Sequence, residues 1–289
     1  MTNVSEKLSG VADALGANMP TSSHKVSLWA LCAVSVSFVG LFARYLDEVE
    51  ERKNNRLLLR FTNLFCGTFC CIVSVMYYSI IFIQAGHGTV AGFYDVLVGK
   101  TLLSPLEEFQ VSVVNALMLA YMSQDLVGRL IWKNFRWQFV LHHVACIVGL
   151  VNSMFFGQSG MFAAAVGLSE FSTPLVTVVE IARADGMNKL FQSFGVVLFF
   201  IFPARVFLFT YLNYLWLAVH DESPAFGAHE KYPHMVGVTS MSSIVVLTFL
   251  NWVWWGNLLQ GVYNAFFKAK PSLPAPAYAE RKTKSQKAE

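Results

Sequence analysis

The stretch Gln138–Phe156, QFVLHHVACIVGLVNSMFF, contains 19 residues and no Asp, Glu, Lys or Arg. A helix that crosses a lipid bilayer needs about 20 mostly apolar residues, so this stretch is long enough to span one. Two adjacent histidines, His142 and His143, lie near its start. The stretch therefore predicts a transmembrane helix that carries ionisable groups.

Six further apolar runs of similar length lie on either side, each bounded by charged or turn-forming residues. They are Val26–Ala43, Phe61–Ile83, Phe109–Trp132, Met161–Ile181, Leu190–Val219 and Val238–Phe267. Pro203 lies inside one of the longest runs, where its missing backbone N–H predicts a kink or a strong tilt. The pattern predicts an all-α, multi-pass membrane protein with about seven transmembrane helices.

The composition agrees with a chain that lies in lipid. Of the 289 residues, 55% are hydrophobic and only 13% are charged, whereas soluble domains average about 45–50% and about 25%. A soluble fold of this length needs more charged surface than that. The formal net charge is only +3 and the Lys and Arg residues are not gathered into an RNA- or DNA-binding face, so nucleic acid is not an expected partner.

The distribution of basic residues predicts an orientation. With seven spans, the segments 44–60, 133–137, 182–189 and the C-terminal region share one side and hold 15 of the 21 Lys and Arg residues, against 4 on the other side. Since basic residues favour the cytoplasmic side, we expect a cytoplasmic C-terminus and a lumenal or external N-terminus. Residues 269–289 are rich in Pro and Lys and predict a disordered basic tail that contacts anionic lipid.

All five cysteines lie inside apolar runs, where a thiol behaves as a small apolar side chain. Their spacing lacks the second cluster that a zinc site requires. The sequence therefore predicts neither a disulfide framework nor a metal site.

Polar residues inside the spans are the informative ones, because an ionisable side chain in lipid costs several kcal/mol unless it faces protein or a wet cavity. In the third run they recur at helical spacing on one face. The polar ones are Ser112, Asn115, Asp125 and Arg129, and Met122 lies on the same face. Asp125 and Arg129 are four residues apart and can pair, either as a structural ion pair that lets the helix insert or as part of a binding site.

The two histidines point about 100° apart on a helix. The face of His142 continues with small or polar residues, namely Ala145, Cys146, Gly149, Asn152 and Ser153. The face of His143 continues with Ile147, Leu150, Val151 and Met154. We therefore expect His142 to point inward and His143 to lie to one side, nearer a neighbouring helix or lipid.

Glu170 lies in the fifth run with Thr173 and Thr177 at helical spacing from it. Two roles are open for this carboxyl group: a general acid or base for His142, or the neutralising partner of Arg205 in the sixth run. The last run adds Asn251 and a group of tryptophans, which we interpret as anchors at the membrane interface.

Five short motifs follow one another along the chain: SQDL at 123–126, WKNFRW at 132–137, LHHVA at 141–145, LSEFSTP at 168–174 and NWVW at 251–254. Together they resemble the TLC-domain family, which includes ceramide synthases, translocon-associated proteins and small lipid-homeostasis proteins. The resemblance covers residues 56–268, which we expect to form the TLC domain. The apolar runs and the composition add a leader at 1–25, a first transmembrane helix and linker at 26–55, and the tail at 269–289.

The resemblance also implies a bundle of six helices around a lipid-sized cavity, with one further helix alongside, in the endoplasmic reticulum or connected membranes. In the family's ceramide synthases, a histidine pair and downstream aspartates transfer an acyl group from acyl-CoA to a sphingoid amine. The pair corresponds to His142 and His143, but Glu170 and then Ser172-Thr173-Pro174 stand where the aspartates are expected. This pattern is more similar to the small TLC-domain-containing proteins.

Two main hypotheses follow. In the first, the protein binds, senses or moves an acyl lipid without a cofactor, and its head-group ligands are Asn115, Arg129, Asn152, Thr173, Arg205 and Asn251. In the second, it is an N-acyltransferase of the ceramide-synthase kind with acyl-CoA as co-substrate, and its catalytic residues are His142, His143, Glu170 and Asp125. A third hypothesis is that the protein is a transporter or a structural subunit.

Overall fold

The computed structural model describes residues 22–54, 59–97, 100, 101, 103–131, 136–156, 165, 167–219 and 233–267. Throughout these residues every regular element is helical, which confirms the predicted all-α class. The basic tail, most of the leader and part of the WKNFRW turn lie outside the described residues.

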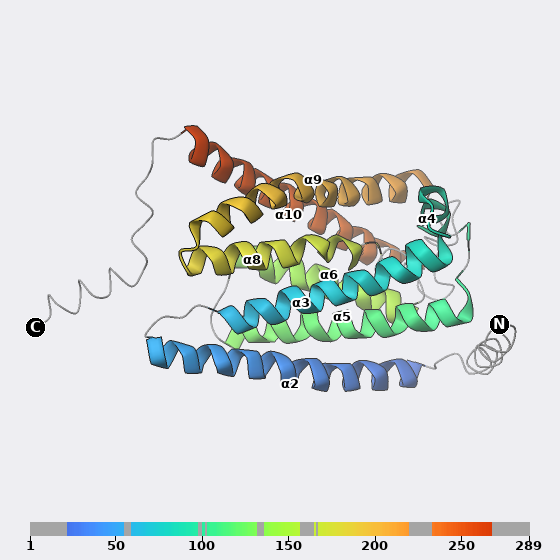
Figure 1. Cartoon of the computed structure of the whole chain (residues 1–289). Helices are drawn as coiled ribbons and strands as arrows, with labels where there is room; N and C mark the ends of the chain where they lie inside the picture. Colours follow the sequence, from blue (N-terminus) through green and yellow to red (C-terminus); the bar gives the residue numbers. More distant parts are fainter. Residues whose placement is uncertain are drawn as a thin grey trace, which may run out of the picture.

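The long helices lie side by side along one common direction, with α2 at one edge of the bundle (Figure 1). In chain order the elements are α2 Ser22–Asn54, α3 Arg60–Tyr77, its π-helical continuation η1 Tyr78–Ala85, α4 Val90–Leu97, α5 Pro105–Ile131, α6 Trp137–Phe156, the short 3₁₀ helix η2 Ser169–Ser172, α8 Thr173–Ala184, α9 Asn188–Val219 and α10 Pro233–Phe267.

Within the described residues, six helices are long and apolar enough to cross a membrane. They are Lys25–Lys53, Arg60–Ala85, Pro105–Ile131, Trp137–Phe155, Asn188–Ala218 and Gly237–Asn264, which match six of the predicted runs. The remaining run, 161–181, corresponds to η2 and the 12-residue helix α8. Its first residues, 161–164, lie outside the described part of the chain.

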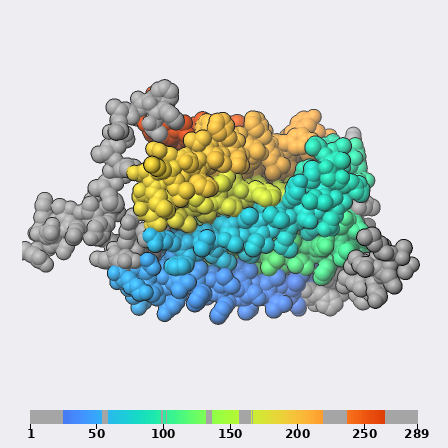
Figure 2. All heavy atoms as spheres, in the orientation of Figure 1, coloured from blue at the N-terminus to red at the C-terminus, as the bar shows by residue number. Residues whose placement is uncertain are grey.

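The packing partners close six helices into a ring: α3 contacts α8, α8 contacts α9, α9 contacts α10, α10 contacts α6, α6 contacts α5, and α5 returns to α3. The remaining long helix, α2, packs on the outside of the ring, mainly against α5 and α3. In the space-filling view, α2, α3, α8 and α9 form successive bands of one continuous face (Figure 2). This arrangement confirms the expected bundle of six helices with one further helix alongside.

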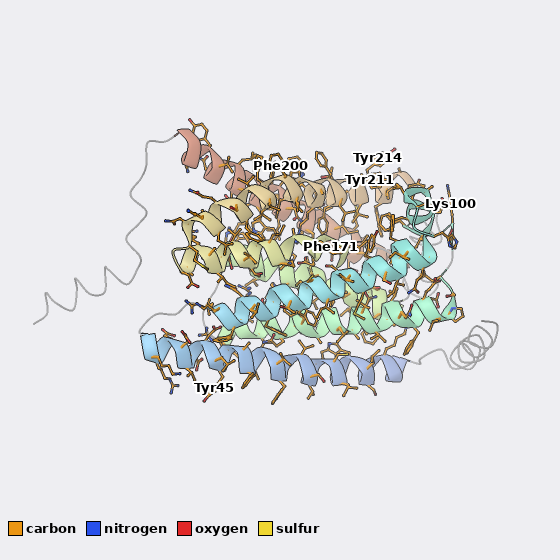
Figure 3. All side chains as sticks on the ribbon, viewed as in Figure 1. Tyr45, Lys100, Phe171, Phe200, Tyr211 and Tyr214 are labelled. Atoms are coloured by element: carbon orange, nitrogen blue, oxygen red, sulfur yellow. The ribbon has the colours of Figure 1, made fainter. Side chains whose placement is uncertain are left out.

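Helix α9 contains Pro203 within its length and changes direction along its course (Figure 1). A proline inside a helix removes one backbone hydrogen bond and clashes with the preceding turn, which accounts for a bend there. Phe200, Tyr211 and Tyr214 of this helix point away from the bundle (Figure 3). Large apolar side chains that face outward are expected where the solvent is lipid.

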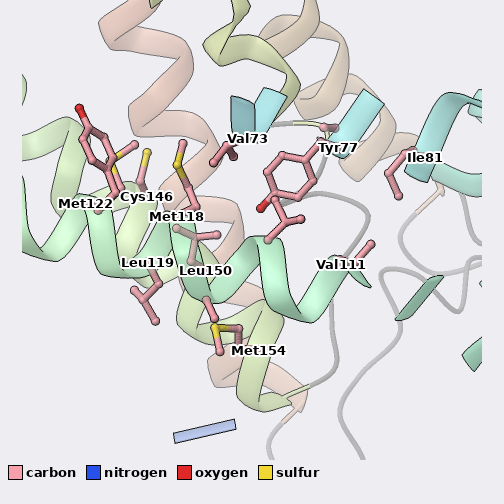
Figure 4. Packing of buried hydrophobic residues seen from close by; sticks show 14 of the residues in the cluster. Val73, Tyr77, Ile81, Val111, Met118, Leu119, Met122, Cys146, Leu150 and Met154 are labelled. Carbon is pink, nitrogen blue, oxygen red and sulfur yellow. The ribbon is translucent and has the colours of Figure 1, made fainter. Parts of the chain in front are cut away.

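Buried side chains of α3, α5 and α6 pack together in the apolar core. Figure 4 shows Val73 and Tyr77 of α3 beside Met118 of α5 and Leu150 of α6, and all four are buried. Close approach of α3 to α8 depends on Gly67, because a Cβ atom at this position would overlap the hydroxyl of Thr177. Small residues allow this kind of close helix packing in membranes.

The start of α3 is capped by a side chain from α2, a feature the sequence analysis did not identify. Asp47 is only 2% exposed and accepts hydrogen bonds from the backbone N–H groups of Phe61 and Thr62, both at 2.9 Å. It thereby satisfies donors that a helix N-terminus leaves without an intrahelical partner. The neighbouring Arg60 pairs with Asp185 at the end of α8, at 2.8 Å.

Candidate functional site

His143 is held on both sides by acceptors. Its Nε2 atom lies 2.8 Å from Oδ2 of Asp125 on α5, and its Nδ1 atom lies 2.6 Å from the carbonyl oxygen of Phe139 one turn earlier on α6. A carboxylate and a carbonyl oxygen thus lie within hydrogen-bond distance of the two ring nitrogens of His143. Of the two expected neighbours of His143, the structure shows the adjacent helix and not lipid.

Asp125 also accepts a hydrogen bond from Nε of Arg129, at 2.6 Å. The spacing of four residues on α5 brings these two side chains together, as the sequence predicted. The guanidinium of Arg129 lies 4.5 Å from the centre of the Phe139 ring. One carboxylate thus contacts both Arg129 on its own helix and His143 on the next.

A second charged group is built around Arg205 of α9, which is buried. Its Nη2 atom donates to Oε1 of Glu170 at 3.0 Å, and its Nε atom donates to Oδ1 of Asn251 on α10 at 2.7 Å. Its Nη1 atom donates to Oγ of Ser172 at 3.2 Å. These bonds supply the partners that a cation in the middle of a membrane requires.

Glu170 and Ser172 reach Arg205 because they lie on the 3₁₀ helix that precedes α8. Pro174 lies in the first turn of α8 and cannot donate a backbone hydrogen bond, so the chain enters α8 through this tighter turn. The hydroxyl of Thr173 donates to the other carboxylate oxygen of Glu170. Of the two roles open for Glu170, the pairing with Arg205 is the one with hydrogen-bond geometry.

His142 lies between the two charged groups and is 6% exposed. Its Nε2 atom lies 3.9 Å from Oε1 of Glu170, and its ring centre lies 5.4 Å from the ring centres of both His143 and Trp254. The nearest hydrogen-bonding atom is the sulfur of Cys146, 3.7 Å from Nε2. In the part of the chain that the structure describes, no nitrogen or oxygen lies within hydrogen-bond distance of this imidazole.

We call this connected set the polar centre. It runs across α5, α6, η2, α8, α9 and α10, and it consists of Arg129, Asp125, His143, His142, Glu170, Thr173, Arg205 and Asn251. The two arginines balance the two carboxylates in formal charge. Charged and polar groups gathered in a buried site favour a ligand with a polar head group.

Two candidate residues lie apart from the polar centre. Asn115 accepts a hydrogen bond from the Tyr77 hydroxyl at 2.5 Å and donates to Ser153 at 3.0 Å. Asn152 donates to Thr239 at 2.8 Å and also to Ser240. Both lie on the same helix faces as the polar centre but at a different position along the helix axes. Ten residues of α-helix, for example, separate Asn115 from Asp125 by about 15 Å.

Two side chains near His142 were not singled out as ligands from the sequence. Trp254 lies 5.8 Å from the guanidinium of Arg205 and packs edge-on against His142, so it belongs to the interior and is not an interface anchor. Cys146 follows His142 by one helical turn. Its presence on the small and polar face of α6 was the signal that could have identified it.

The described residues include no group of three or more His, Cys, Asp or Glu side chains placed to hold a metal ion. They do include a groove of about 280 Å³ on the outer side of the ring, between α2 and α5. It is lined by Ala33, Ser37, Leu41, Ala120, Ser123, Gln124, Val127, Gly128 and Ile131. The lipid-sized cavity expected inside the ring stays a prediction.

A model of the TLC domain matches residues 60–260 of this chain. The match extends from the start of α3 to within the last two turns of α10 and includes every residue of the polar centre. No curated protein and no solved structure matches the chain.

Proposed function

This chain belongs to the TLC-domain family, and we propose that it acts in membrane lipid homeostasis by binding an acyl lipid inside its ring of six helices. Binding of this kind serves either to sense the lipid or to move it. The polar centre holds the head group, and the apolar side chains of the surrounding helices hold the acyl chain.

The observation that carries this proposal is the state of His142. Leaving a buried polar group without a partner costs about 1–3 kcal/mol, yet this imidazole has no nitrogen or oxygen partner while Arg205, Glu170 and His143 around it are all paired. A ligand that brings a hydroxyl, amide or phosphate group to His142 removes that cost. Within the polar centre, His142 is therefore the residue whose ring nitrogens are left to form hydrogen bonds with a ligand.

The hydrogen-bonding capacity of His142 supports a lipid that carries both an acceptor and a donor group. A neutral imidazole can accept one hydrogen bond and donate another. An ester, an amide or a phosphate next to a hydroxyl group provides both complements.

We further propose the orientation and location expected from the sequence, with a cytoplasmic C-terminus in the endoplasmic reticulum or a connected membrane. Arg52 and Lys53 end α2, Arg60 begins α3, and Arg183 lies in the last turn of α8. The ion pair of Arg60 with Asp185 joins the start of α3 to the end of α8. Basic residues are thus gathered at one end of the bundle, which supports the proposal.

A second candidate function is acyl transfer from acyl-CoA to a sphingoid amine, and the absence of a nitrogen or oxygen partner for His142 among the described residues favours it. An imidazole with an unbonded nitrogen is suited to act as a general base or to accept an acyl group transiently. In this reading His142 takes the proton of the amine. Asp125 acts indirectly, because it binds His143 at 2.8 Å, and Glu170 faces His142 at 3.9 Å.

One experiment separates the two candidates. The purified full chain is incubated with labelled long-chain acyl-CoA and with sphingoid or lysophospholipid acceptors, and retained lipid and new product are both measured. Wild type is compared with His142→Ala and with Asn213→Ala, a control that removes a hydrogen bond between α9 and α10 outside the polar centre.

Retained lipid that falls with His142→Ala and not with Asn213→Ala, without product, supports binding alone. Product that disappears only with His142→Ala supports the transferase and contradicts binding alone. Neither retained lipid nor product in the wild-type protein contradicts both.

A further inference from the structure

Cys146 and His142 form a thiol and imidazole pair on one face of α6. The sulfur of Cys146 lies 3.7 Å from Nε2 and 3.9 Å from Nδ1 of His142, and its residue is 4% exposed. Figure 4 shows Cys146 beside Met118 and Met122 of α5, on the inside of the bundle. All five cysteines of the chain are free.

The other thiols have different surroundings. Cys66 of α3 lies 2.7 Å from the hydroxyl of Tyr121, and no described contact joins Cys32, Cys70 or Cys71 to a histidine. Among the described residues, Cys146 is therefore the thiol that has a base beside it. That base is also a buried side chain for which no nitrogen or oxygen partner is found in the described part of the chain.

The helix surface one turn beyond Cys146 is open at Gly149. A Cβ atom added at Gly149, one turn further along α6, would meet nothing within 4 Å. The face that runs from His142 past Cys146 to Gly149 is thus polar at one end and open at the other. An acyl group fits this face when its carbonyl carbon lies at the sulfur of Cys146 and its apolar chain lies along Gly149.

We infer that Cys146 accepts an acyl group from an acyl thioester such as acyl-CoA, with His142 as its base. The inference rests on the proposed function, since it assumes that acyl compounds bind at the polar centre. A bond forms between Sγ of Cys146 and the carbonyl carbon, and the bond between that carbon and the donor sulfur breaks. His142 takes the thiol proton and delivers it to the departing thiolate, so the exchange needs no oxidant or reductant.

The surroundings of Cys146 explain why its thiol needs a base in order to react. A thiol buried among apolar side chains is not ionised at rest, whereas the thiolate is the nucleophile. Proton transfer to His142 as the new bond forms supplies the nucleophile when it is needed. The imidazolium produced in this step faces Glu170 at 3.9 Å, and this carboxylate stabilises it.

The test uses the purified full chain and a long-chain acyl-CoA that carries a terminal alkyne. We expect a covalent label that neutral hydroxylamine removes and that mass spectrometry places on Cys146. Cys146→Ala loses the label, and His142→Ala forms it about 100-fold more slowly, the usual contribution of a general base. Cys70→Ala, which removes an equally buried thiol from α3, keeps it.

Three results overturn the inference: a label on His142 or on other cysteines in place of Cys146, a rate that His142→Ala leaves unchanged, or no label at all. Retained lipid is measured in the same samples. Wild-type protein that retains lipid but takes no label contradicts this inference and leaves the proposed function intact. Cys146→Ala that retains lipid like the wild type shows that loss of its label is not due to misfolding.

Discussion

Arg205 of α9 and Glu170 of η2 form an ion pair at 3.0 Å in which both side chains are more than nine-tenths buried. The two residues are 35 positions apart in the sequence and lie on different elements. Charges in such a place are tolerated because each compensates for the desolvation of the other. The stability of the ring and the electrostatics of the polar centre therefore depend on the same contact.

Removing one partner of the ion pair between Glu170 and Arg205 should destabilise the protein much more than removing both. We expect Glu170→Leu to destabilise the protein by about 3–5 kcal/mol, because it leaves Arg205 as a buried charge. The double variant Glu170→Leu with Arg205→Met should recover a large part of that loss. Thermal unfolding in detergent, followed by tryptophan fluorescence, measures both. A double variant as unstable as the sum of the two single variants contradicts the direct pairing.

The two histidines should differ in their effect on stability. His143→Ala removes hydrogen bonds to Asp125 and Phe139 and leaves a buried carboxylate with one partner fewer, so we expect a loss of about 2–4 kcal/mol. His142→Ala removes no hydrogen bond to nitrogen or oxygen and should cost clearly less. The same unfolding assay compares them. Equal losses would show that His142 has a structural partner.

The cap that α2 provides to α3 can be tested in isolation. Asp47→Ala removes the acceptor of two backbone N–H groups, and loss of a helix cap costs about 0.5–2 kcal/mol. Asp47→Asn keeps one acceptor oxygen and should cost less. Glu48→Ala is the matched control, since its ion pair with Arg44 is at 3.6 Å and partly exposed. A larger loss from Glu48→Ala than from Asp47→Ala would contradict the capping role.

The close contact between α3 and α8 predicts a steric effect at Gly67. Gly67→Ala places a methyl group on the hydroxyl of Thr177, and overpacking of this kind costs about 1–3 kcal/mol. Combining it with Thr177→Ala should relieve most of the clash. Gly195→Ala in α9, where an added Cβ meets nothing within 4 Å, should cause no loss. Unfolding midpoints that do not separate Gly67→Ala from Gly195→Ala would contradict the contact.

Most of the fold could be predicted from hydrophobic length alone. The run predicted at 138–156 is the helix Trp137–Phe156, because apolar length and flanking charges set where a helix enters and leaves lipid. The helix α4, Val90–Leu97, was missed, because eight residues in a loop between spans show no clear period. The π-helical end of α3 was also missed, since it leaves the apolar composition unchanged.

The candidate site was predictable where its contacts are local. Asp125 and Arg129 pair because one helical turn separates them, and this geometry can be calculated from the sequence. The contact of Asp125 with His143 depends on how α5 and α6 are aligned along their axes, which is set by packing across the whole interface. For the same reason the sequence analysis grouped Asn115 and Asn152 with the centre, although their partners lie at other depths.

The most direct test of the central claim is photocrosslinking with an acyl lipid that carries a diazirine group near its carbonyl carbon. The purified protein is loaded with this lipid and irradiated, and the crosslinked residues are identified by mass spectrometry. The account predicts crosslinks on α6 near His142 and on η2 near Glu170, and their loss with His142→Ala. Crosslinks confined to outward-facing residues such as Phe38, Phe200 and Leu217 would show that lipid only surrounds the bundle, and would contradict the account.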